Sequence, residues 1–182
     1  MGCRRFSGPD LAILPELLTA RLTLRRLEFA DATFLVRLLN EPSFIANIGD
    51  RGVRSIDDAH RYLREGPIAM YEKYGFGLWQ VTRNSDGAAV GICGLLKREN
   101  LPDVDIGYAF LPEHWGFGYA FEAAEAAMRH GAVKFGLKRI IAVVSQHNDA
   151  SIRLLEKLGL RYERLIAMHP EEPLVRLYGR DI

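Results

Sequence analysis

A glycine-containing turn between a strand-like run and a long alanine-rich stretch constrains this chain more than any other feature. Val104 to Leu111 reads as a strand, and the turn after it carries Gly116 and Gly118. Beyond the turn, apolar residues recur at helical spacing, at Ala124, Ala127, Met128, Gly131, Ala132 and Phe135. Such a turn leaves backbone N–H groups free at the positive end of a helix, where a phosphate group can bind. The sequence therefore predicts an α/β fold with an anion-binding turn.

The size and charge of the chain exclude several other classes. Its 182 residues, 48% of them apolar, predict one domain over residues 16–182 after a loose N-terminal extension, residues 1–15. A net charge of +1 indicates neither a nucleic-acid nor a membrane partner, and no apolar run approaches the ~20 residues of a membrane span. Cys3 and Cys93 form no metal-binding spacing and no disulfide framework, which suits a reducing cytoplasm.

Periodicity predicts the order of the remaining elements. The expected strands cover residues 19–27, 76–82, 88–96, 104–111, 140–144, 160–167 and 174–178. The expected helices cover residues 31–40, 55–69 and 151–158, and a further helix follows the glycine turn and extends to Phe135. Glu41-Pro42 is expected to end the first helix. This order implies a mixed sheet with helices packed on its faces.

The turn by itself leaves more than one ligand open. A Walker A loop needs Gly-Lys-Ser/Thr, whereas the chain has Gly118-Tyr119-Ala120. A dinucleotide fingerprint needs Gly or Ala where Phe121 stands, and an acid at the end of the next strand, which Ile140 to Val144 lacks. A turn that uses glycine only for tightness remains open.

Three blocks of sequence together resemble the GNAT superfamily of N-acetyltransferases. Pro112 to Ala123 resembles its acetyl-CoA pyrophosphate loop, Asn148 to Leu160 its second motif, and Asp105-Ile106-Gly107-Tyr108 the strand before the loop. The closest branch is the ribosomal-protein N-terminal acetyltransferase type (RimJ/RimL-like). The resemblance covers nearly the whole chain and implies the GNAT acyl-CoA N-acyltransferase fold, a mixed sheet of about seven strands flanked by about four helices.

The resemblance also implies a donor and the residues that hold it. The co-substrate is acetyl-CoA, with no metal, and its diphosphate would be cradled by backbone N–H groups of the glycine turn. Phe110 would offer its backbone N–H to the thioester carbonyl, and Asn148 would orient the pantetheine. The implied cofactor-binding residues are Phe110, Trp115, Gly116, Phe117, Gly118, Tyr119, Ala120, Asn148 and Arg153.

The catalytic residues are the least constrained part of the prediction. Asp105 is the candidate general base, at the strand position where the family often has Glu; a solvated strand carboxylate is the open alternative, and Asp103 and Glu72 are further candidates. Many members have a Tyr acid where this chain has Leu155. Ser151 is then the candidate acid, beside Asn148, although Ser151 could simply belong to a helix cap.

The expected activity is transfer of acetyl from acetyl-CoA to a primary amine, of a protein N-terminus or a small molecule, in a bacterial cytoplasm. Direct attack on the thioester is expected, because Cys93 lies outside the motifs. The loop from Ile48 to Arg54 lies where this fold usually closes over the acceptor. A homodimer is left open, and the alternative function is a non-catalytic acyl-CoA-binding sensor or interaction module.

Overall fold

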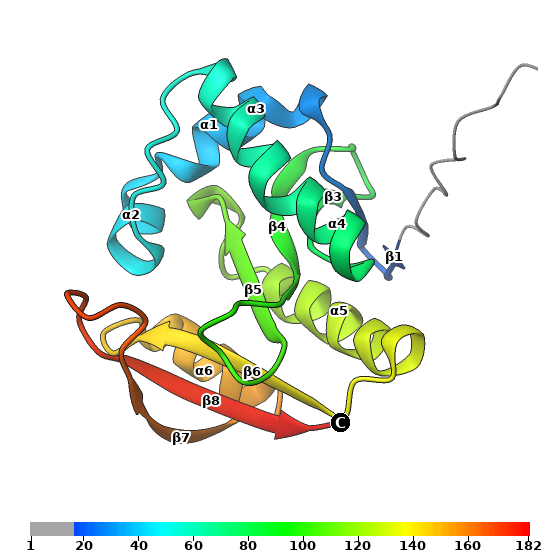
Figure 1. Cartoon of the computed structure of the whole chain (residues 1–182). Helices are drawn as coiled ribbons and strands as arrows, with labels where there is room; N and C mark the ends of the chain where they lie inside the picture. The colour runs from blue at the N-terminus through cyan, green and yellow to red at the C-terminus, as the bar shows by residue number, and fades with distance from the viewer. Residues whose placement is uncertain (1–16) are drawn as a thin grey trace, which may run out of the picture.

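A single mixed sheet organises the chain (Figure 1). The computed structural model describes residues 17–182, so the predicted extension, residues 1–15, lies outside the described residues. The strands are β1 (Leu17–Leu18), β2 (Leu22–Arg26), β3 (Leu78–Arg83), β4 (Ala89–Leu96), β5 (Asp105–Phe110), β6 (Arg139–Ser145), β7 (Arg161–Ile166) and β8 (Val175–Asp181). Their order in the sheet is β1-β2-β3-β4-β5-β6-β8-β7. Every neighbouring pair is antiparallel except β5 and β6, which are parallel.

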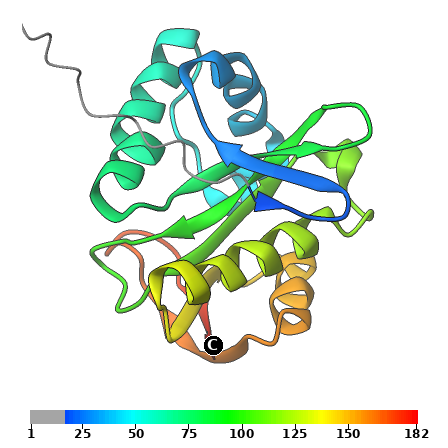
Figure 2. The same ribbon diagram turned by 90° about the vertical axis from the view of Figure 1, so that its right-hand side faces the viewer.

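Helices cover both faces of this sheet (Figure 2). They are α1 (Ala32–Leu39), α2 (Pro42–Ile48), α3 (Ile56–Leu63), α4 (Ala69–Tyr74), α5 (Tyr119–Phe135) and α6 (Asp149–Lys157). Short turns η1 (Phe29–Asp31) and η3 (Pro112–His114) precede α1 and α5, and the π-helical turn η2 (Arg64–Ile68) joins α3 to α4. Ser55 starts α3 with a capping box, in which its side chain accepts from the Asp58 N–H and the Asp58 side chain accepts from the Ser55 N–H.

Two apolar cores follow from this layering. One core lies between the sheet and α5 and α6, and includes Trp79, Ala123 and Leu155. The other lies on the opposite face, under α1 and α3, and includes Leu35 and Leu63. Successive strand residues alternate between them, as Leu78 and Trp79 do. Each face of the central strands is therefore covered, which explains their nearly continuous apolar sequences.

The fold class is confirmed, with differences in detail. The sheet has eight strands rather than about seven, because β1 contains only two residues and is too short to show a pattern. Pro42 does not simply end a helix: it occupies the first turn of α2, where its missing N–H costs nothing. The helix that begins at α3 continues through Pro67 to Tyr74. Within residues 17–182, no helix is long and apolar enough to cross a membrane.

Candidate active site

Strands β5 and β6 run side by side for only a short distance. Their register holds one Cα pair, Asp105 with Ile141, beside a 3.0 Å hydrogen bond from the Ile141 N–H to the Val104 carbonyl. Strand β5 then continues along β4 to Phe110, whereas β6 diverges from it (Figure 1). The sheet is therefore split beyond Asp105.

The backbone of β5 presents every second residue to this split. The Leu111 N–H donates to the Val90 carbonyl beside β4, and the Val104 carbonyl accepts from β6. Because hydrogen-bonding directions alternate along a strand, the N–H groups of Tyr108 and Phe110 point away from β4 and toward the split. An extended ligand could pair with this edge as an added strand does.

The glycine turn lies at the C-terminal end of β5. Gly116 and Gly118 have φ of +81° and +80°, a conformation that costs an L-residue about 1–2 kcal/mol. Gly118 is the N-cap of α5 and provides no side-chain cap, so the N–H groups of Tyr119 and Ala120 have no partner within the helix. A Cβ would meet nothing within 4 Å at Gly116, and at Gly118 only Arg21 Nη2, at 3.5 Å. The backbone conformation itself therefore requires glycine, before any ligand is considered.

An arginine directly before β2 holds this turn in place. Arg21 Nη1 donates to the Phe117 carbonyl at 2.8 Å, and Arg21 Nε donates to Glu122 Oε2 at 2.7 Å. The other Glu122 oxygen accepts from the Arg21 N–H at 2.9 Å and from Thr19 Oγ1 at 2.6 Å. Arg21 also lies 4.9 Å from the centre of the Tyr119 ring. Sequence reasoning missed this clamp, since 101 residues separate Arg21 from Glu122.

Two aromatic side chains of the turn remain exposed. Trp115 and Phe117 are 52% and 56% exposed, and Phe117 stacks on Tyr119 with ring centres 5.7 Å apart. Trp115 Nε1 donates to the Phe110 carbonyl at 2.8 Å. The Phe110 carbonyl is thereby engaged, while its N–H still faces the split. Exposed aromatic surface at a site of this kind suits the apolar and ring portions of a ligand.

Asp105 stands at the closed end of the split. Its side chain is 1% exposed, and its Oδ1 is buried without a hydrogen-bond partner. Arg98 Nη2 lies 3.3 Å from the other oxygen. Burial raises the pKa of Asp105 to about 6, and the positive charge of Arg98 opposes that shift. The carboxyl is therefore not the solvated strand carboxylate of the open alternative, and its pKa suits a proton acceptor near neutral pH.

Ser151 lies against a second hydroxyl group, that of Tyr108. Ser151 Oγ is 2.7 Å from Tyr108 Oη, and the Ser151 N–H donates to Asn148 Oδ1 at 3.1 Å. Asn148 is thus the N-cap of α6. Burial raises the pKa of the Tyr108 phenol, and its bond to Ser151 opposes the shift. Tyr108 was part of the strand motif, but nothing in the sequence indicated that it would meet Ser151.

Asp105 and Tyr108 occupy opposite faces of β5. Tyr108 packs on the core under α5 and α6, whereas Ala109 packs on the core under α1 and α3. Asp105 is four residues before Ala109 and therefore lies on the same face of the strand as Ala109. From Asp105 to Phe110 the strand spans about 17 Å, at ~3.4 Å per residue. The arrangement can hold an extended ligand along the split, with a carboxyl on one face and two hydroxyls on the other.

The remaining candidates are placed less tightly. Arg153 is exposed on α6. The alternative base Asp103 is engaged by Arg139 at 3.2 Å, and Glu72 is exposed on α4. Cys93 is fully buried opposite Tyr108 on β4, and burial raises the pKa of its thiol. Among residues 17–182, no group of three or more His, Cys, Asp or Glu side chains could hold a metal ion.

Known proteins share this sequence pattern and this fold. The acetyltransferase (GNAT) domain model matches residues 21–161. The uncharacterized protein YkkB of Bacillus subtilis (strain 168) is 33% identical over 158 residues, which cover 83% of this chain and 88% of that protein. The uncharacterized N-acetyltransferase YoaA of the same organism is 30% identical over 158 residues, covering 86% of this chain and 89% of that protein.

A solved structure extends the likeness to three dimensions. The structure of RimL, ribosomal L7/L12 alpha-N-protein acetyltransferase, in complex with coenzyme A has a TM-score of 0.79 to this chain. It covers 92% of this chain and 98% of its own, at 18% identity, so the likeness concerns the fold.

Proposed function

This chain belongs to the acetyltransferase (GNAT) family, and from that premise we propose that it transfers the acetyl group of acetyl-CoA to a primary amine. The acceptor is a protein N-terminus or a small-molecule amine. The three motif blocks support the RimJ/RimL-like branch, and residues 16–182 act as one catalytic unit. Its proposed location is the cytoplasm. The cysteines form neither a metal-binding spacing nor a disulfide framework, which suits a reducing compartment.

One observation carries the proposal: the glycine turn and the split of the sheet are continuous. The free N–H groups at the start of α5 suit a diphosphate. The N–H groups of Tyr108 and Phe110 then follow along the split edge of β5, which suits the amides of a pantetheine arm. A donor held this way has its thioester between Phe110 and Asp105. A backbone N–H aimed at the thioester oxygen is worth about 3–4 kcal/mol in the transition state.

Asp105 would accept the proton of the attacking amine, directly or through water. Deprotonation at pH 7 costs about 1.4 kcal/mol for an α-amine and about 4–5 kcal/mol for a lysine side chain. A carboxyl with a pKa of about 6 is mostly ionised at pH 7 and remains a stronger base than an ordinary aspartate. The C–N bond forms as the C–S bond breaks.

Ser151 would donate a proton to the departing sulfur and recover one from Tyr108 Oη, its hydrogen-bonding partner, and solvent water would return a proton to Tyr108. Asn148 supports this geometry by fixing the start of α6. Arg21 supports the donor by holding the Phe117 carbonyl. Cys93 takes no part, because it is fully buried and burial raises its thiol pKa.

The test is release of CoA thiol from acetyl-CoA with a panel of amines and N-terminal peptides. We expect release with at least one acceptor, near-complete loss in Asp105→Asn, and unchanged turnover in Cys93→Ala. If Cys93→Ala abolished turnover while acetyl-CoA binding persisted, direct attack would be wrong. Acetyl-CoA binding without release on every acceptor would instead support the sensor.

A further inference from the structure

Apolar side chains gather beside Asp105 on the half of the sheet beyond the split. Asp105 is paired with Ile141 of β6, and paired residues of neighbouring strands project to the same face of a sheet. Ile141 belongs to a cluster of apolar side chains that come from β6, β7, β8 and two loops. We call this cluster the apolar floor, and its members are Leu101, Ile141, Val143, Ile166, Met168 and Leu177.

The apolar floor crosses three strands in register. Val143 of β6 lies opposite Leu177 of β8, and Ile166 of β7 lies opposite Val175, two residues from Leu177 on the same face. Since neighbouring strands are about 4.8 Å apart, the apolar floor extends roughly 10 Å from β6 to β7. Figure 1 shows these three strands together, on the side of the split away from β4.

The loop between β4 and β5 joins the apolar floor to Asp105. Arg98 Nη2 of this loop lies 3.3 Å from Asp105 Oδ2, and Leu101 of the same loop is a member of the apolar floor. Asn100 Nδ2 donates to the Met168 carbonyl at 2.9 Å. One loop therefore contacts both the buried carboxyl and the apolar surface beside it.

Part of the apolar floor is covered and part is open. Three of its members are at most 4% exposed, whereas Val143, Ile166 and Met168 are half-buried. Val143 follows Ile141 on the same face of β6, where β5 and β6 are no longer paired, so it borders the split. The open part of the apolar floor is thus continuous with the candidate active site.

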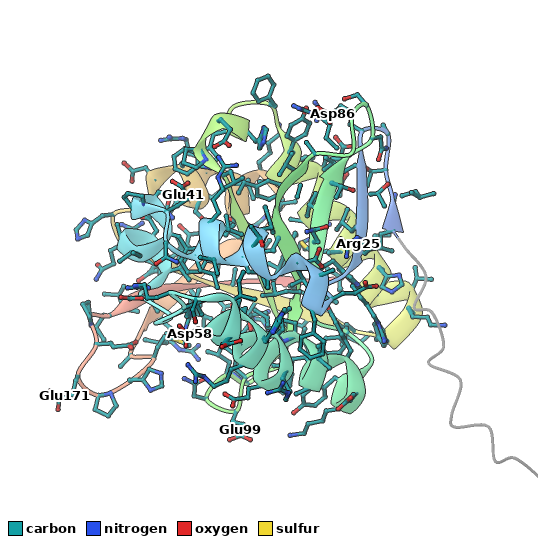
Figure 3. All side chains as sticks on the ribbon, turned by 90° about the horizontal axis from the view of Figure 1, so that it is seen from above. Arg25, Glu41, Asp58, Asp86, Glu99 and Glu171 are labelled. Carbon is teal, nitrogen blue, oxygen red and sulfur yellow. The ribbon has the colours of Figure 1, made fainter. Side chains whose placement is uncertain are left out.

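Charged groups border the apolar floor without interrupting it. At the start of β6, Arg139 is paired with three carboxylates, those of Asp103, Glu163 and Asp181. Glu99, in the loop between β4 and β5, and Glu171, in the loop between β7 and β8, lie at the rim of the molecule (Figure 3). An amine at this site therefore meets the Asp105 carboxyl at one end and apolar side chains beyond it.

Such a surface suits an apolar group better than a peptide. The side chains of the apolar floor carry no hydrogen-bonding group apart from the weakly accepting thioether of Met168. The ladder between β6 and β8 uses the backbone groups that lie between these two strands. Amide groups of a peptide laid across this face would be left without partners, which opposes binding. An alkyl or aryl group has no such groups and gains free energy when it leaves water.

We propose that the acceptor is a small-molecule primary amine whose nitrogen carries an apolar chain or ring, and that the apolar floor binds that group. This inference rests on the proposed acetyltransferase function and specifies its acceptor class. The nitrogen lies at Asp105, and the apolar group extends over Val143 toward Met168. Val143 is then a specificity-determining residue, because it borders both the split and the open part of the apolar floor.

The test uses linear primary alkylamines of increasing chain length, with release of CoA thiol as the readout. The pKa of each amine stays near that of a lysine side chain, about 10.4, so deprotonation costs the same throughout the series. We expect kcat/KM to rise about three- to fourfold for each added methylene, the effect of burying one such group, until the chain outgrows the apolar floor. Peptides that begin with Gly or with Leu form the second arm, and each should be a poorer acceptor than the longer alkylamines.

Val143→Thr tests the residue, and Val133→Thr is its matched control. Threonine keeps the β-branched shape of valine but replaces a methyl group with a hydroxyl group. Val133 is 82% exposed on α5, which packs on the other face of the sheet. Val143→Thr should flatten the rise of kcat/KM with chain length, mainly through KM for the long amines, with KM for acetyl-CoA unchanged. Val133→Thr should preserve the rise, and Met168→Gln, at the outer end of the apolar floor, should lower kcat/KM for the longest chains.

The possible failures can be told apart. If kcat/KM did not rise with chain length, the apolar acceptor class would be overturned and the acetyltransferase function would stand. A higher kcat/KM for a peptide than for every alkylamine would overturn the small-molecule assignment. An unchanged dependence on chain length in both Val143→Thr and Met168→Gln would overturn the role of the apolar floor. Absence of CoA release with every acceptor would overturn the proposed function, and this inference with it.

Discussion

The two ends of strand β5 are built in different ways. At its C-terminal end, the chain passes without interruption from Phe110 through the glycine turn into α5, so one contiguous segment forms the anion site. At its N-terminal end, the buried Asp105 is paired with Arg98, which the loop between β4 and β5 contributes. The donor end depends on backbone conformation, whereas the acceptor end depends on a side-chain contact made by a loop residue. A family can keep the first and vary the second.

At the donor end, the largest expected effect comes from breaking the glycine turn. Gly118→Val places a β-branched residue at a φ of +80° directly before α5, so the turn must change shape. We expect kcat/KM for acetyl-CoA to fall by about 100-fold or more, because the free N–H groups lose their arrangement. The measurement is acetyl-CoA titration with steady-state kinetics.

Gly136→Val is the matched control for this change. Gly136 follows the other end of α5 with a φ of +64°, and a Cβ there would meet nothing within 4 Å. It should lower stability to a similar extent and leave KM for acetyl-CoA unchanged. Equal loss of acetyl-CoA binding in both variants would mean that helix stability, and not the turn, controls the donor site.

The two hydroxyls at the split should act as a unit. Tyr108→Phe and Ser151→Ala each remove one partner of the 2.7 Å contact, and we expect kcat to fall about 30- to 100-fold in each. The double variant should be little worse than either single one, because a shared step can be lost only once. Additive losses in the kinetic cycle would show that Tyr108 and Ser151 work independently.

A smaller effect is expected from the clamp on the turn. Arg21→Met removes the bonds to Phe117 and Glu122, which should raise KM for acetyl-CoA about tenfold with a lesser change in kcat. Glu122→Gln should have a similar effect, since it weakens the same contacts. Arg37→Met, which breaks an exposed ion pair with Glu113, should change neither constant. If Arg21→Met altered kcat alone, Arg21 would not be a positioning residue for the donor.

The smallest effect, and the one that probes the acceptor end, is a shift in pH dependence. Asp105 must be ionised to accept a proton, so kcat/KM should rise with pH through about 6. Arg98 opposes the rise in the pKa of Asp105, so Arg98→Gln should move this limb to higher pH. A pH–rate profile of kcat/KM measures the shift. If the limb of the pH profile did not move in Arg98→Gln, its pKa would belong to a group other than Asp105.

The pH dependence of the free energy of unfolding provides an independent check on Asp105. Ionisation of Asp105 is expected to raise activity but to lower stability. Its pKa in the folded protein is raised, so its contribution is fully present below about pH 4 and is lost as the pH rises through about 6. Asp105→Asn should therefore raise the free energy of unfolding at pH 7, by about 1–3 kcal/mol for a shift of about two pKa units, while it abolishes turnover. Chemical denaturation of both proteins at pH 4 and pH 7 measures this. If the free energy of unfolding changed between the two pH values by the same amount in Asp105→Asn as in the wild type, the prediction would be contradicted.

Sequence reasoning reached the donor end because its elements are local. The strand, the two left-handed glycines and the start of α5 all lie between Asp105 and Ala120, where spacing alone indicates structure. Strand β1 was missed because two residues carry no periodicity. Helix α2 was missed because proline is typical both just after a helix and in the first turn of a helix. Pro42 was interpreted only as the end of the first helix, whereas it also begins α2.

The rest of the site depends on contacts between distant segments. Arg21 meets Glu122, and Tyr108 meets Ser151, only once the sheet is assembled. Nor does any local pattern reveal that β5 and β6 share a single pair of residues before they part. The sequence could nominate Asp105 and Ser151, but only packing shows a buried carboxyl and a paired hydroxyl.

The most direct test of the account is amide hydrogen exchange along the split, with and without acetyl-CoA. Binding should protect the N–H groups of Tyr108 and Phe110 and those from Gly116 to Ala120. Edge strand β7, from Arg161 to Ile166, is the internal control, because it also has an unpaired edge and should not change. Unchanged exchange at Phe110 and Gly118, with protection elsewhere, would contradict the claim that the split and the glycine turn hold the donor.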